Sequence, residues 1–375
     1  MTMRKRIIQL VVIVAIALIS RFVDLDALIA QSRTNVLAHG SDPRGVHEAV
    51  ICSQNLANYG ALPDVIRRVP GMSAERLAEK EAALVRRFAK AECDVIGVQE
   101  VLSRDEEAGK KALTRLATQL RFATYRQYDI ATGPSNDPNL RNGYIFARDR
   151  VELLNKVSYY QVELPKLIET EKPRLFSRGP LEVQLQIKGQ GEAPPKTLTL
   201  VNFHFKSKRG GKDDPAQLDW ETARMQMAEA VRRIVNNRHK KSYEDGQSLL
   251  ILLGDRNSHF DAASAKILDG TLSLGMFQGD GVCRLSKRGV PLCQAQQAKP
   301  PNFFSVLTSD PQTKLLTGTH RYKKEYSWLD EILMAQPGLA AAWERFDSTG
   351  DYASGVIYEP REASDHALVW VRLNW

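Results

Sequence analysis

Carboxylate, amide and imidazole side chains stand at the ends of several apolar segments of this chain. The clearest segment runs from Leu249 to Leu253 and is followed by Gly254, Asp255 and Asn257. Five apolar residues in a row are typical of one strand that is buried on both faces. The run predicts a strand whose polar groups emerge at the edge of a sheet, where Gly254 gives the backbone room to turn. Taken alone, the same pattern also fits an ordinary Asx turn.

The same design recurs in five other segments, each of which places groups suited to catalysis beside a predicted strand. Their ranges are 48–55, 93–100, 198–204, 326–333 and 364–371. The polar groups that they carry are Asn55, Glu100, His204, Asp330, Asp365 and His366. Six unrelated turns do not explain such a collection, so we expect these side chains to gather at one site.

Six short motifs follow the order in which they occur in the endonuclease/exonuclease/phosphatase superfamily, which has the deoxyribonuclease-I-like fold. They are Gln54-Asn55-Leu56, Val98-Gln99-Glu100, Asn202-Phe203-His204, Gly254-Asp255-Arg256-Asn257, Trp328-Leu329-Asp330 and Ser364-Asp365-His366. No single motif is specific, but the ordered set is. The chain resembles this superfamily from residue 46 to its C-terminus, and it is similar to bacterial exported nuclease members. The resemblance implies an α/β fold, a four-layer α/β/β/α sandwich of two packed mixed sheets flanked by helices.

Hydrolysis of a phosphodiester needs a metal or cations to neutralise the phosphoryl oxygens, a base that aims a water, and an acid for the leaving oxygen. Oxygen ligands select Mg²⁺ or Mn²⁺, which bind through one or two carboxylates and several waters. We therefore expect Glu100 to bind the metal, with Asn55 and Asp365 completing its protein ligands. The competing interpretation is that Glu100 only caps the helix that follows it.

The resemblance also implies catalytic roles for the remaining groups. Asp255 would polarise the attacking water, and Asn257 would donate to a non-bridging phosphate oxygen. Asp330 would hold His366 in one tautomer, because an aspartate inside a strand is costly to bury without a partner. The alternative for Asp330 is a hydrogen bond from a nearby backbone amide. Asp365, next to His366, is expected at the same site.

His204 is the most informative of these residues. The deoxyribonuclease, sphingomyelinase and inositol-phosphatase branches of the superfamily have a histidine at this place, whereas the abasic-site repair branch does not. Its expected role is to stabilise or protonate at the phosphate, opposite His366. Arg178 matches a family position that contacts phosphate, and Lys206 follows His204 closely, so both are candidate phosphate ligands.

Two residues depart from the family pattern. The family usually has Phe where this chain has Arg256, so we expect that side chain to be exposed or to contact the phosphate. In the deoxyribonuclease branch a carboxylate orients the histidine that corresponds to His204. Arg141 or Asn142 occupies that place here, which puts the proton relay of His204 in doubt but not the metal centre.

Composition and charge allow several classes of substrate. The 375 residues are 43% hydrophobic and 26% charged, and the formal net charge of +8 favours an anionic partner. We favour a metal-dependent phosphodiesterase, an exported endonuclease that takes DNA or RNA. The alternative is a phosphatase or phospholipid phosphodiesterase of the phosphoinositide or sphingomyelin type. A third, remote alternative is a catalytically silent binding module, and the chain indicates no obligate protein partner.

The N-terminus predicts export. Arg4, Lys5 and Arg6 precede an apolar run from Ile7 to Ile19, which is too short for a comfortable membrane span but fits the core of a signal peptide. We expect residues 1–30 to be a signal peptide, or an anchor that tethers the chain to the inner membrane through residues 7–20. Residues 31–45 are expected to be a flexible tether, and residues 46–375 the catalytic domain.

Four cysteines in an exported chain favour pairing. Cys283 and Cys293 flank a short polar loop, so a bridge between them is expected. Cys52 and Cys93 lie on two segments that the resemblance makes close neighbours, and a second bridge is plausible there.

Apolar periodicity predicts helices over 73–90, 105–120 and 214–237, with Ser73 as the N-cap of the first and Asp214, followed by Pro215, as the cap of the third. The segment 129–143 is rich in Gly, Pro, Ser, Asn and Asp and predicts a long surface loop. The segment 270–324 is expected to be irregular.

Overall fold

The computed structural model describes residues 48–188, 195–208, 218, 220–244, 248–293, 302–309, 318–322, 325–335 and 354–374. The expected leader and tether fall outside these residues. Within the described ranges, no helix combines the length and the apolar character needed to cross a membrane.

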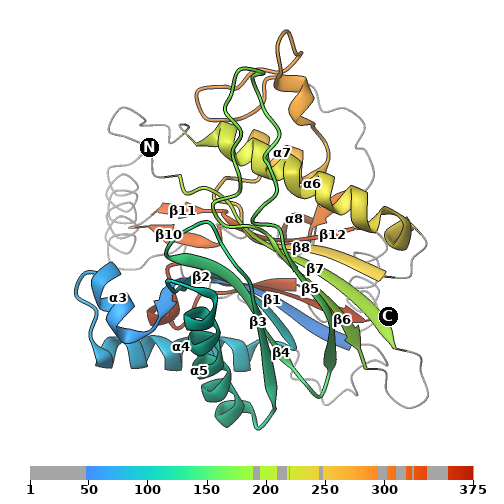
Figure 1. Ribbon diagram of the computed structural model, residues 1–375. Coiled ribbons are helices and arrows are strands. Elements are labelled where there is room, and N and C mark those ends of the chain that lie inside the picture. The colour runs from blue at the N-terminus through green and yellow to red at the C-terminus, as the bar shows by residue number, and fades with distance from the viewer. Residues whose placement is uncertain are drawn as a thin grey trace, which may run out of the picture.

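Two six-stranded sheets pack face to face (Figure 1). The first sheet contains, in spatial order, β13 (Ser354–Ile357), β14 (Leu368–Asn374), β1 (Glu48–Gly60), β2 (Val95–Leu102), β4 (Leu140–Ala147) and β3 (Tyr128–Thr132). The second contains β5 (Val151–Ser158), β6 (Leu181–Ile187), β7 (Lys196–His204), β8 (Ser248–Asp255), β12 (Asp330–Ala335) and β9 (Phe303–Ser305). The β1–β2 and β7–β8 pairs are parallel and the other pairs are antiparallel, so both sheets are mixed.

Strand β8 explains how the layers are held together. Leu249, Ile251 and Leu253 point into the core between the two sheets, whereas Leu250 and Leu252 belong to the core beneath the outer helices. Because side chains alternate across a strand, an uninterrupted apolar run covers both faces. The strand is therefore buried on both sides, as its sequence predicts.

Helices cover the outer faces of both sheets (Figure 1). The first sheet is covered by α3 (Leu62–Arg68), α4 (Ala74–Lys90) and α5 (Glu106–Thr124), and the second by α6 (Glu221–Glu244) and α7 (Ala263–Asp269). The expected cap at Ser73 is present, because its side chain accepts from the Arg76 amide at 3.3 Å. The side chain of Asp105 also caps its helix and accepts from the Ala108 amide at 2.7 Å. The expected cap at Asp214 falls outside the described residues. Helices thus flank two mixed sheets, which confirms the predicted four-layer fold class.

Smaller elements join these layers. They are η1 (Leu274–Phe277), α8 (Val306–Ser309), η2 (Arg361–Ala363) and the two-stranded ribbon of β10 (His320–Tyr322) and β11 (Glu325–Ser327). The elements β9, α8 and β10 lie inside the segment predicted to be irregular. That prediction was therefore only partly correct.

The prediction of a long loop over 129–143 was wrong at both ends. Tyr128–Thr132 forms the edge strand β3, and Leu140 already begins β4. Ile130 packs partly buried against the core of the first sheet and Ala131 is buried between the sheets. Local composition hides this pairing, because the strand is stabilised by contacts with β4 rather than by its own propensity.

Both expected disulfides are present. Cys52 of β1 is joined to Cys93, which lies just before β2, with a Cα–Cα distance of 5.9 Å. Cys283 is joined to Cys293, with a Cα–Cα distance of 5.0 Å. Both distances fall in the usual range for a disulfide.

Candidate active site

Three candidate residues stand side by side where strands of the second sheet reach one edge. In the strand register, Asp255 at the end of β8 is paired with His204 at the end of β7 and with Asp330 at the start of β12. Both strands next to β8 therefore bring their polar residue to the same level. All three side chains are buried.

Asn55 and Glu100 come from the first sheet, at places where its pairing is irregular. The β1–β2 register shifts after Asn55, and the β2–β4 register shifts next to Glu100. Glu100 has a left-handed backbone conformation with φ of 57°. Ala57 and Asn58, with φ of 47° and 60°, are also left-handed. Such bulges and strained residues re-aim side chains and concentrate at functional sites.

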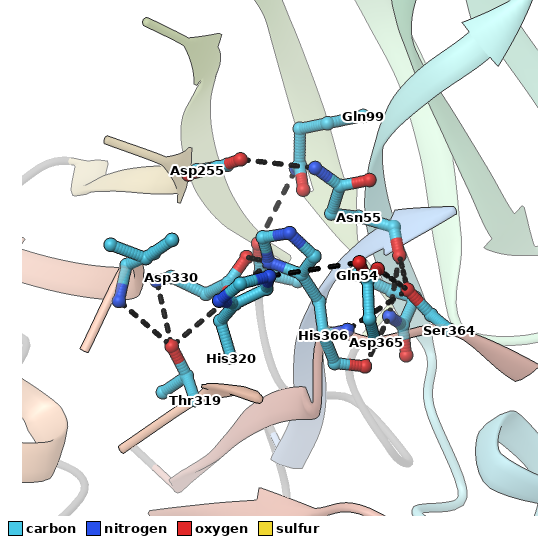
Figure 2. Close-up of polar contacts among 12 residues, drawn as sticks. Gln54, Asn55, Gln99, Asp255, Thr319, His320, Asp330, Ser364, Asp365 and His366 are labelled. Carbon is cyan, nitrogen blue, oxygen red and sulfur yellow. Dashed lines mark hydrogen bonds and ion pairs between the residues drawn. The ribbon is translucent and has the colours of Figure 1, made fainter. Parts of the chain in front are cut away.

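The polar residues of the first sheet meet those of the second in the space between the sheets. Figure 2 shows this for Asn55 and Asp255. The Asn55 amide Nδ2 donates to Asp255 Oδ2 at 3.0 Å. His204 Nε2 lies 3.6 Å from the same Asp255 oxygen and 3.9 Å from Glu100 Oε1. The structure therefore brings Asn55, Glu100, His204 and Asp255 into one cluster.

A buried amide network fixes the two sheets relative to each other beneath this cluster. Asn202 Nδ2 on β7 donates to the carbonyls of Val98 at 3.0 Å and Gly143 at 2.9 Å. Its Oδ1 accepts from Gln99 Nε2 at 2.8 Å. These bonds run from the second sheet to β2 and β4 of the first, so they hold the strand that carries His204 against the strand that carries Glu100.

The turn after β8 shapes the Asp255 carboxylate. Gly254 has φ of 144°, and a Cβ there would lie 1.9 Å from the Phe203 carbonyl oxygen, so only glycine fits. The Asn257 backbone amide donates to Asp255 Oδ1 at 2.8 Å. Asn257 Nδ2 donates to Asp255 Oδ2 at 3.1 Å and to the Phe205 carbonyl at 3.2 Å. Both amide hydrogens of Asn257 are engaged, so its position here is that of a residue that orients Asp255.

Asp330 has the histidine partner that its buried position requires. His366 Nδ1 lies 2.7 Å and 3.0 Å from the two carboxylate oxygens of Asp330 (Figure 2). The Thr319 hydroxyl donates to Asp330 Oδ2 at 2.9 Å. Among the described residues, the donors to this carboxylate are therefore side chains rather than the backbone amide of the alternative interpretation.

These surroundings push the pKa values of the buried groups apart. Burial disfavours the charged form of His366, but the Asp330 carboxylate outweighs it and raises the pKa of His366 to about 10. Burial raises the pKa of Asp255 to about 6, against the opposing effect of the His366 charge. Burial, with the positive charges of Arg178 and His366, lowers the pKa of His204 well below its usual range. At neutral pH the cluster thus contains one charged and one neutral imidazole beside a carboxylate.

The second nitrogen of His204 has no partner in the described part of the chain: Nδ1 is buried and accepts or donates no hydrogen bond there. Arg141 donates to the Ser103 carbonyl and hydroxyl instead, and Asn142 Nδ2 donates to the Gly179 carbonyl at 3.1 Å. Neither residue replaces the orienting carboxylate of the deoxyribonuclease branch.

The two basic candidates differ in their positions. Arg178 is buried and its Nη2 donates to the Phe205 carbonyl at 2.6 Å. Burial lowers the pKa of Arg178, while Asp137, Glu100 and Asp255 oppose the shift, so its charge lies close to the cluster. Lys206 instead places its ammonium 4.5 Å from the centre of the Trp220 ring. Among the described residues, Lys206 makes no contact with the cluster.

The expectation that Arg256 is exposed or contacts the phosphate was wrong. Arg256 is 3% exposed and points to the outer face of the second sheet, where Nη1 pairs with Glu331 Oε2 at 2.8 Å. It also donates to the carbonyls of Ser258 at 2.9 Å and Trp328 at 3.1 Å. The guanidinium therefore ties the Asp255 turn to β12, because a buried charge must be paired.

Sequence reasoning assigned no site role to several residues that the structure places here. Thr319, just before β10, and His320, in β10, lie beside Asp330 and His366 (Figure 2). Arg87 of α4 is buried and donates to the His366 carbonyl at 2.6 Å and to Gln54 Oε1 at 3.1 Å. Only the short polar run around Thr319 offered a signal, since Arg87 belongs to a helix whose sequence marks its apolar face alone.

The donor set fits a hard divalent cation. Glu100 Oε2 accepts from the backbone and side-chain nitrogens of Asn58, both at 3.0 Å. Within the described residues its other oxygen, Oε1, accepts no hydrogen bond and remains available as a ligand. Burial lowers the pKa of Lys80 to about 8, and the negative charges of Asp365 and Glu100 oppose that shift. Carboxylates are oxygen donors of the kind that Mg²⁺ or Mn²⁺ prefers.

Comparisons with known proteins identify the fold. No protein-family model and no curated protein sequence matches the chain. A zebrafish (D. rerio) TDP2 humanized by 14 mutations is 15% identical, with a TM-score of 0.50 over 88% of this chain and 100% of that one. The human Nocturnin catalytic domain with bound sulfate is 13% identical, with a TM-score of 0.50 over 88% of this chain and 95% of that one.

An endonuclease/exonuclease/phosphatase from Bacteroides vulgatus is 13% identical, with a TM-score of 0.48 over 87% of this chain and 98% of that one. At these identities the likeness concerns the fold. The chain has the deoxyribonuclease-I-like fold that the resemblance of its ordered motifs implies.

Proposed function

We propose that this chain is a metal-dependent phosphodiester hydrolase whose substrate is nucleic acid. One observation carries the proposal: polar ends from both sheets converge on a buried cluster in which the pKa of His366 is raised to about 10 and that of His204 is lowered. Pairs of titratable groups pushed apart by their surroundings are characteristic of acid–base sites.

The roles follow from the contacts. Glu100 Oε1, Asn55 and Asp365 would hold a Mg²⁺ ion, which when bound supplies charge neutralisation at the phosphoryl oxygens. Asp255, oriented by Asn257, accepts a proton from the attacking water. The water oxygen forms a bond to phosphorus while the bond to the leaving oxygen breaks. The leaving oxygen takes a proton from Nε2 of charged His366, whose Nδ1 donates to the Asp330 carboxylate and so fixes the ring orientation.

His204 and Arg178 complete the phosphate site in this proposal. His204 is neutral at physiological pH, because its pKa is lowered by burial and by nearby positive charge, so it binds by hydrogen bonding. Arg178 supplies a fixed positive charge close to Glu100 and Asp255. Lys206 remains a candidate contact for a longer substrate, since its ammonium stacks on an aromatic ring rather than pairing with the cluster.

Nucleic acid is favoured over smaller substrates by the net charge of +8 and by the resemblance to exported nucleases. The second candidate is a phosphatase or phospholipid phosphodiesterase of the phosphoinositide or sphingomyelin type. Phe260 is the observation in its favour: it is 46% exposed and its ring lies 5.7 Å from that of Trp328, near Asp330. An exposed apolar ring suits contact with a lipid as well as with a nucleobase.

A substrate panel separates these candidates. Purified protein is incubated with plasmid, RNA, abasic duplex, phosphoinositide and sphingomyelin, with and without Mg²⁺. Cleavage of plasmid or RNA that requires Mg²⁺ and falls steeply with salt supports the nuclease proposal. Release of a head group with intact nucleic acids would replace it by the lipid alternative. No turnover of any substrate would leave only the binding module, which the retained acidic and imidazole residues disfavour.

We also propose that the protein is exported. Two disulfides and the predicted N-terminal leader both suit an oxidising compartment. Fractionation of expressing bacterial cells, with mass spectrometry of the mature N-terminus, tests this. Recovery of full-length, reduced protein from the cytosol would contradict it.

A further inference from the structure

A second imidazole lies against the catalytic histidine, and the proposed hydrolase mechanism does not use it. His320 on β10 is bridged antiparallel to His366, and the Arg321 amide donates to the Asp365 carbonyl at 3.0 Å. The Ala367 amide donates to the Thr319 carbonyl at 2.6 Å on the other side. The backbone therefore fixes the side chain of His320 beside that of His366.

The side chains of this group form a compact set of donors (Figure 2). The His320 and His366 ring centroids are 4.5 Å apart, and His320 Nε2 lies 3.6 Å from Asp365 Oδ2. One ligand atom from each of His320, Asp365 and His366 can be chosen so that all three lie within 4.8 Å of one another. Three nitrogen and oxygen donors at this spacing are close enough to converge on one ion after small side-chain movements.

The supporting contacts are those of a histidine ligand. His366 Nδ1 is bonded to the Asp330 carboxylate, which leaves Nε2 to face a ligand. Asp330 is in turn held by the Thr319 hydroxyl at 2.9 Å. A carboxylate behind a metal-binding histidine fixes its tautomer and raises its basicity. The Asp365 side chain is 54% exposed, so an ion reaches the position from solvent and keeps an open coordination site.

We propose that His320, Asp365 and His366 form a binding site for a transition metal ion of the Zn²⁺ type. This site shares Asp365 with the proposed Glu100 magnesium position and adds two imidazoles to it. Two imidazoles and one carboxylate suit Zn²⁺, whereas Mg²⁺ prefers oxygen donors alone. An ion at this position displaces the proton from His366 Nε2, which passes to solvent, and occupies the atom that the proposed hydrolysis needs to protonate the leaving oxygen. Zinc therefore inhibits magnesium-dependent turnover, a consequence that rests on the proposed function; the binding itself does not.

The test measures binding first. Zinc is titrated calorimetrically into the full chain in excess Mg²⁺, and compared with His320→Ala, with the more conservative His320→Gln, and with His259→Ala as a matched control outside the set. We expect one zinc site in the unchanged protein and in the His259→Ala variant. Both His320 variants should bind zinc at least about tenfold more weakly, because loss of even a residue that only supports a metal ligand typically lowers metal affinity by that factor. Circular dichroism and thermal unfolding establish that each variant is folded.

Inhibition is measured second, as the ratio of each variant's rate with zinc to its own rate with Mg²⁺ alone. The zinc concentration for half inhibition should rise in the His320 variants and stay unchanged in the His259→Ala variant. Equal zinc affinity in the unchanged protein and both folded His320 variants would overturn the proposed site. If no phosphoester is hydrolysed at all, the proposed function fails while the calorimetric result still decides the zinc site.

Discussion

At the scale of single residues, the candidate site depends on what surrounds each ionisable group. His204 and His366 lie in the same cluster, yet their pKa values are shifted in opposite directions. The Asp330 carboxylate raises the pKa of His366, whereas burial and the charge of Arg178 lower the pKa of His204. The sequence identified both histidines, because each follows or precedes a strand. It did not predict their opposite charge states, because these depend on residues far away in the chain.

Replacement of His204 or Asp255 by Ala should abolish metal-dependent hydrolysis while the fold remains. Loss of a positioned acid–base group typically costs about 10²- to 10⁴-fold in rate. Initial rates on the best substrate of the panel measure the effect, with His259→Ala as the control. Turnover in the His204→Ala and Asp255→Ala variants equal to that of the unchanged protein would remove both residues from the mechanism.

The pH profile tests the charge states. Because the pKa of Asp255 is raised to about 6, its carboxylate is protonated and inactive as a base below that pH. Because the pKa of His366 is raised to about 10, its imidazolium donates until pH rises through that value. We expect kcat/KM to rise through an apparent pKa near 6 and to stay high until the alkaline end. These values belong to the coupled cluster. A fall in kcat/KM as pH rises through the ordinary histidine pKa would contradict the assignment of His366 as the acid.

At the scale of elements, the buried pair of Arg256 and Glu331 connects the turn after β8 to β12. The pairing joins residues 75 positions apart. Ser305 of β9 also donates to Glu331 at 2.7 Å. Nothing in the sequence around Arg256 marks this partner. The family pattern therefore suggested a phosphate contact where the structure has a tie between strands.

Replacing Arg256 alone should destabilise the fold more than replacing both Arg256 and Glu331 by apolar residues. Arg256→Met leaves the Glu331 carboxylate buried and unpaired, and we expect it to lower the free energy of unfolding by about 3–5 kcal/mol. The double variant Arg256→Met/Glu331→Leu should recover most of that loss, because no charge remains buried. Urea denaturation monitored by circular dichroism measures both. Equal losses in the single and double variants would show that the pair itself is not what matters.

The elements differ in how far their sequences predict them. Strand β8 and helices α4 and α5 are set by apolar periodicity and caps within their own segments. The expected cap occurs at Ser73, and Asp105 caps the next helix. Edge strand β3 was missed because its partner β4, rather than its own residues, stabilises it. Local patterns thus predict elements that bury their own apolar face, and they miss elements that depend on a neighbour.

At the scale of the whole molecule, the candidate site forms only because the two sheets pack face to face in one relative position. Asn202 fixes that position by hydrogen bonds to both β2 and β4. The six ordered motifs predicted that polar groups would gather, and the structure does bring Asn55, Glu100, His204 and Asp255 together. Distances, tautomers and the position of His320 were not predictable, since they arise from the packing between sheets and from β10.

The two disulfides should contribute unequally to stability. Cys52 and Cys93 are 41 residues apart and Cys283 and Cys293 only 10, so the first closes the longer loop in the unfolded chain. In the chain-entropy model the corresponding contributions are about 4 and about 3 kcal/mol. We expect the paired Cys→Ala variant of the first bridge to lose more in urea denaturation than that of the second. The reverse order would mean that native packing outweighs loop closure.

The central claim is that one divalent ion, held by Glu100 between the two sheets, serves phosphodiester hydrolysis. A Mg²⁺ titration tests this claim most directly. The unchanged protein, Glu100→Gln and the surface control Glu107→Gln are stripped with EDTA and assayed on one phosphodiester as Mg²⁺ is restored. We predict no turnover without metal, activation in the unchanged protein and the control, and a loss of at least about 10²-fold in Glu100→Gln. Turnover that survives EDTA, or a Glu100→Gln variant that matches the control at every Mg²⁺ concentration, would contradict the claim.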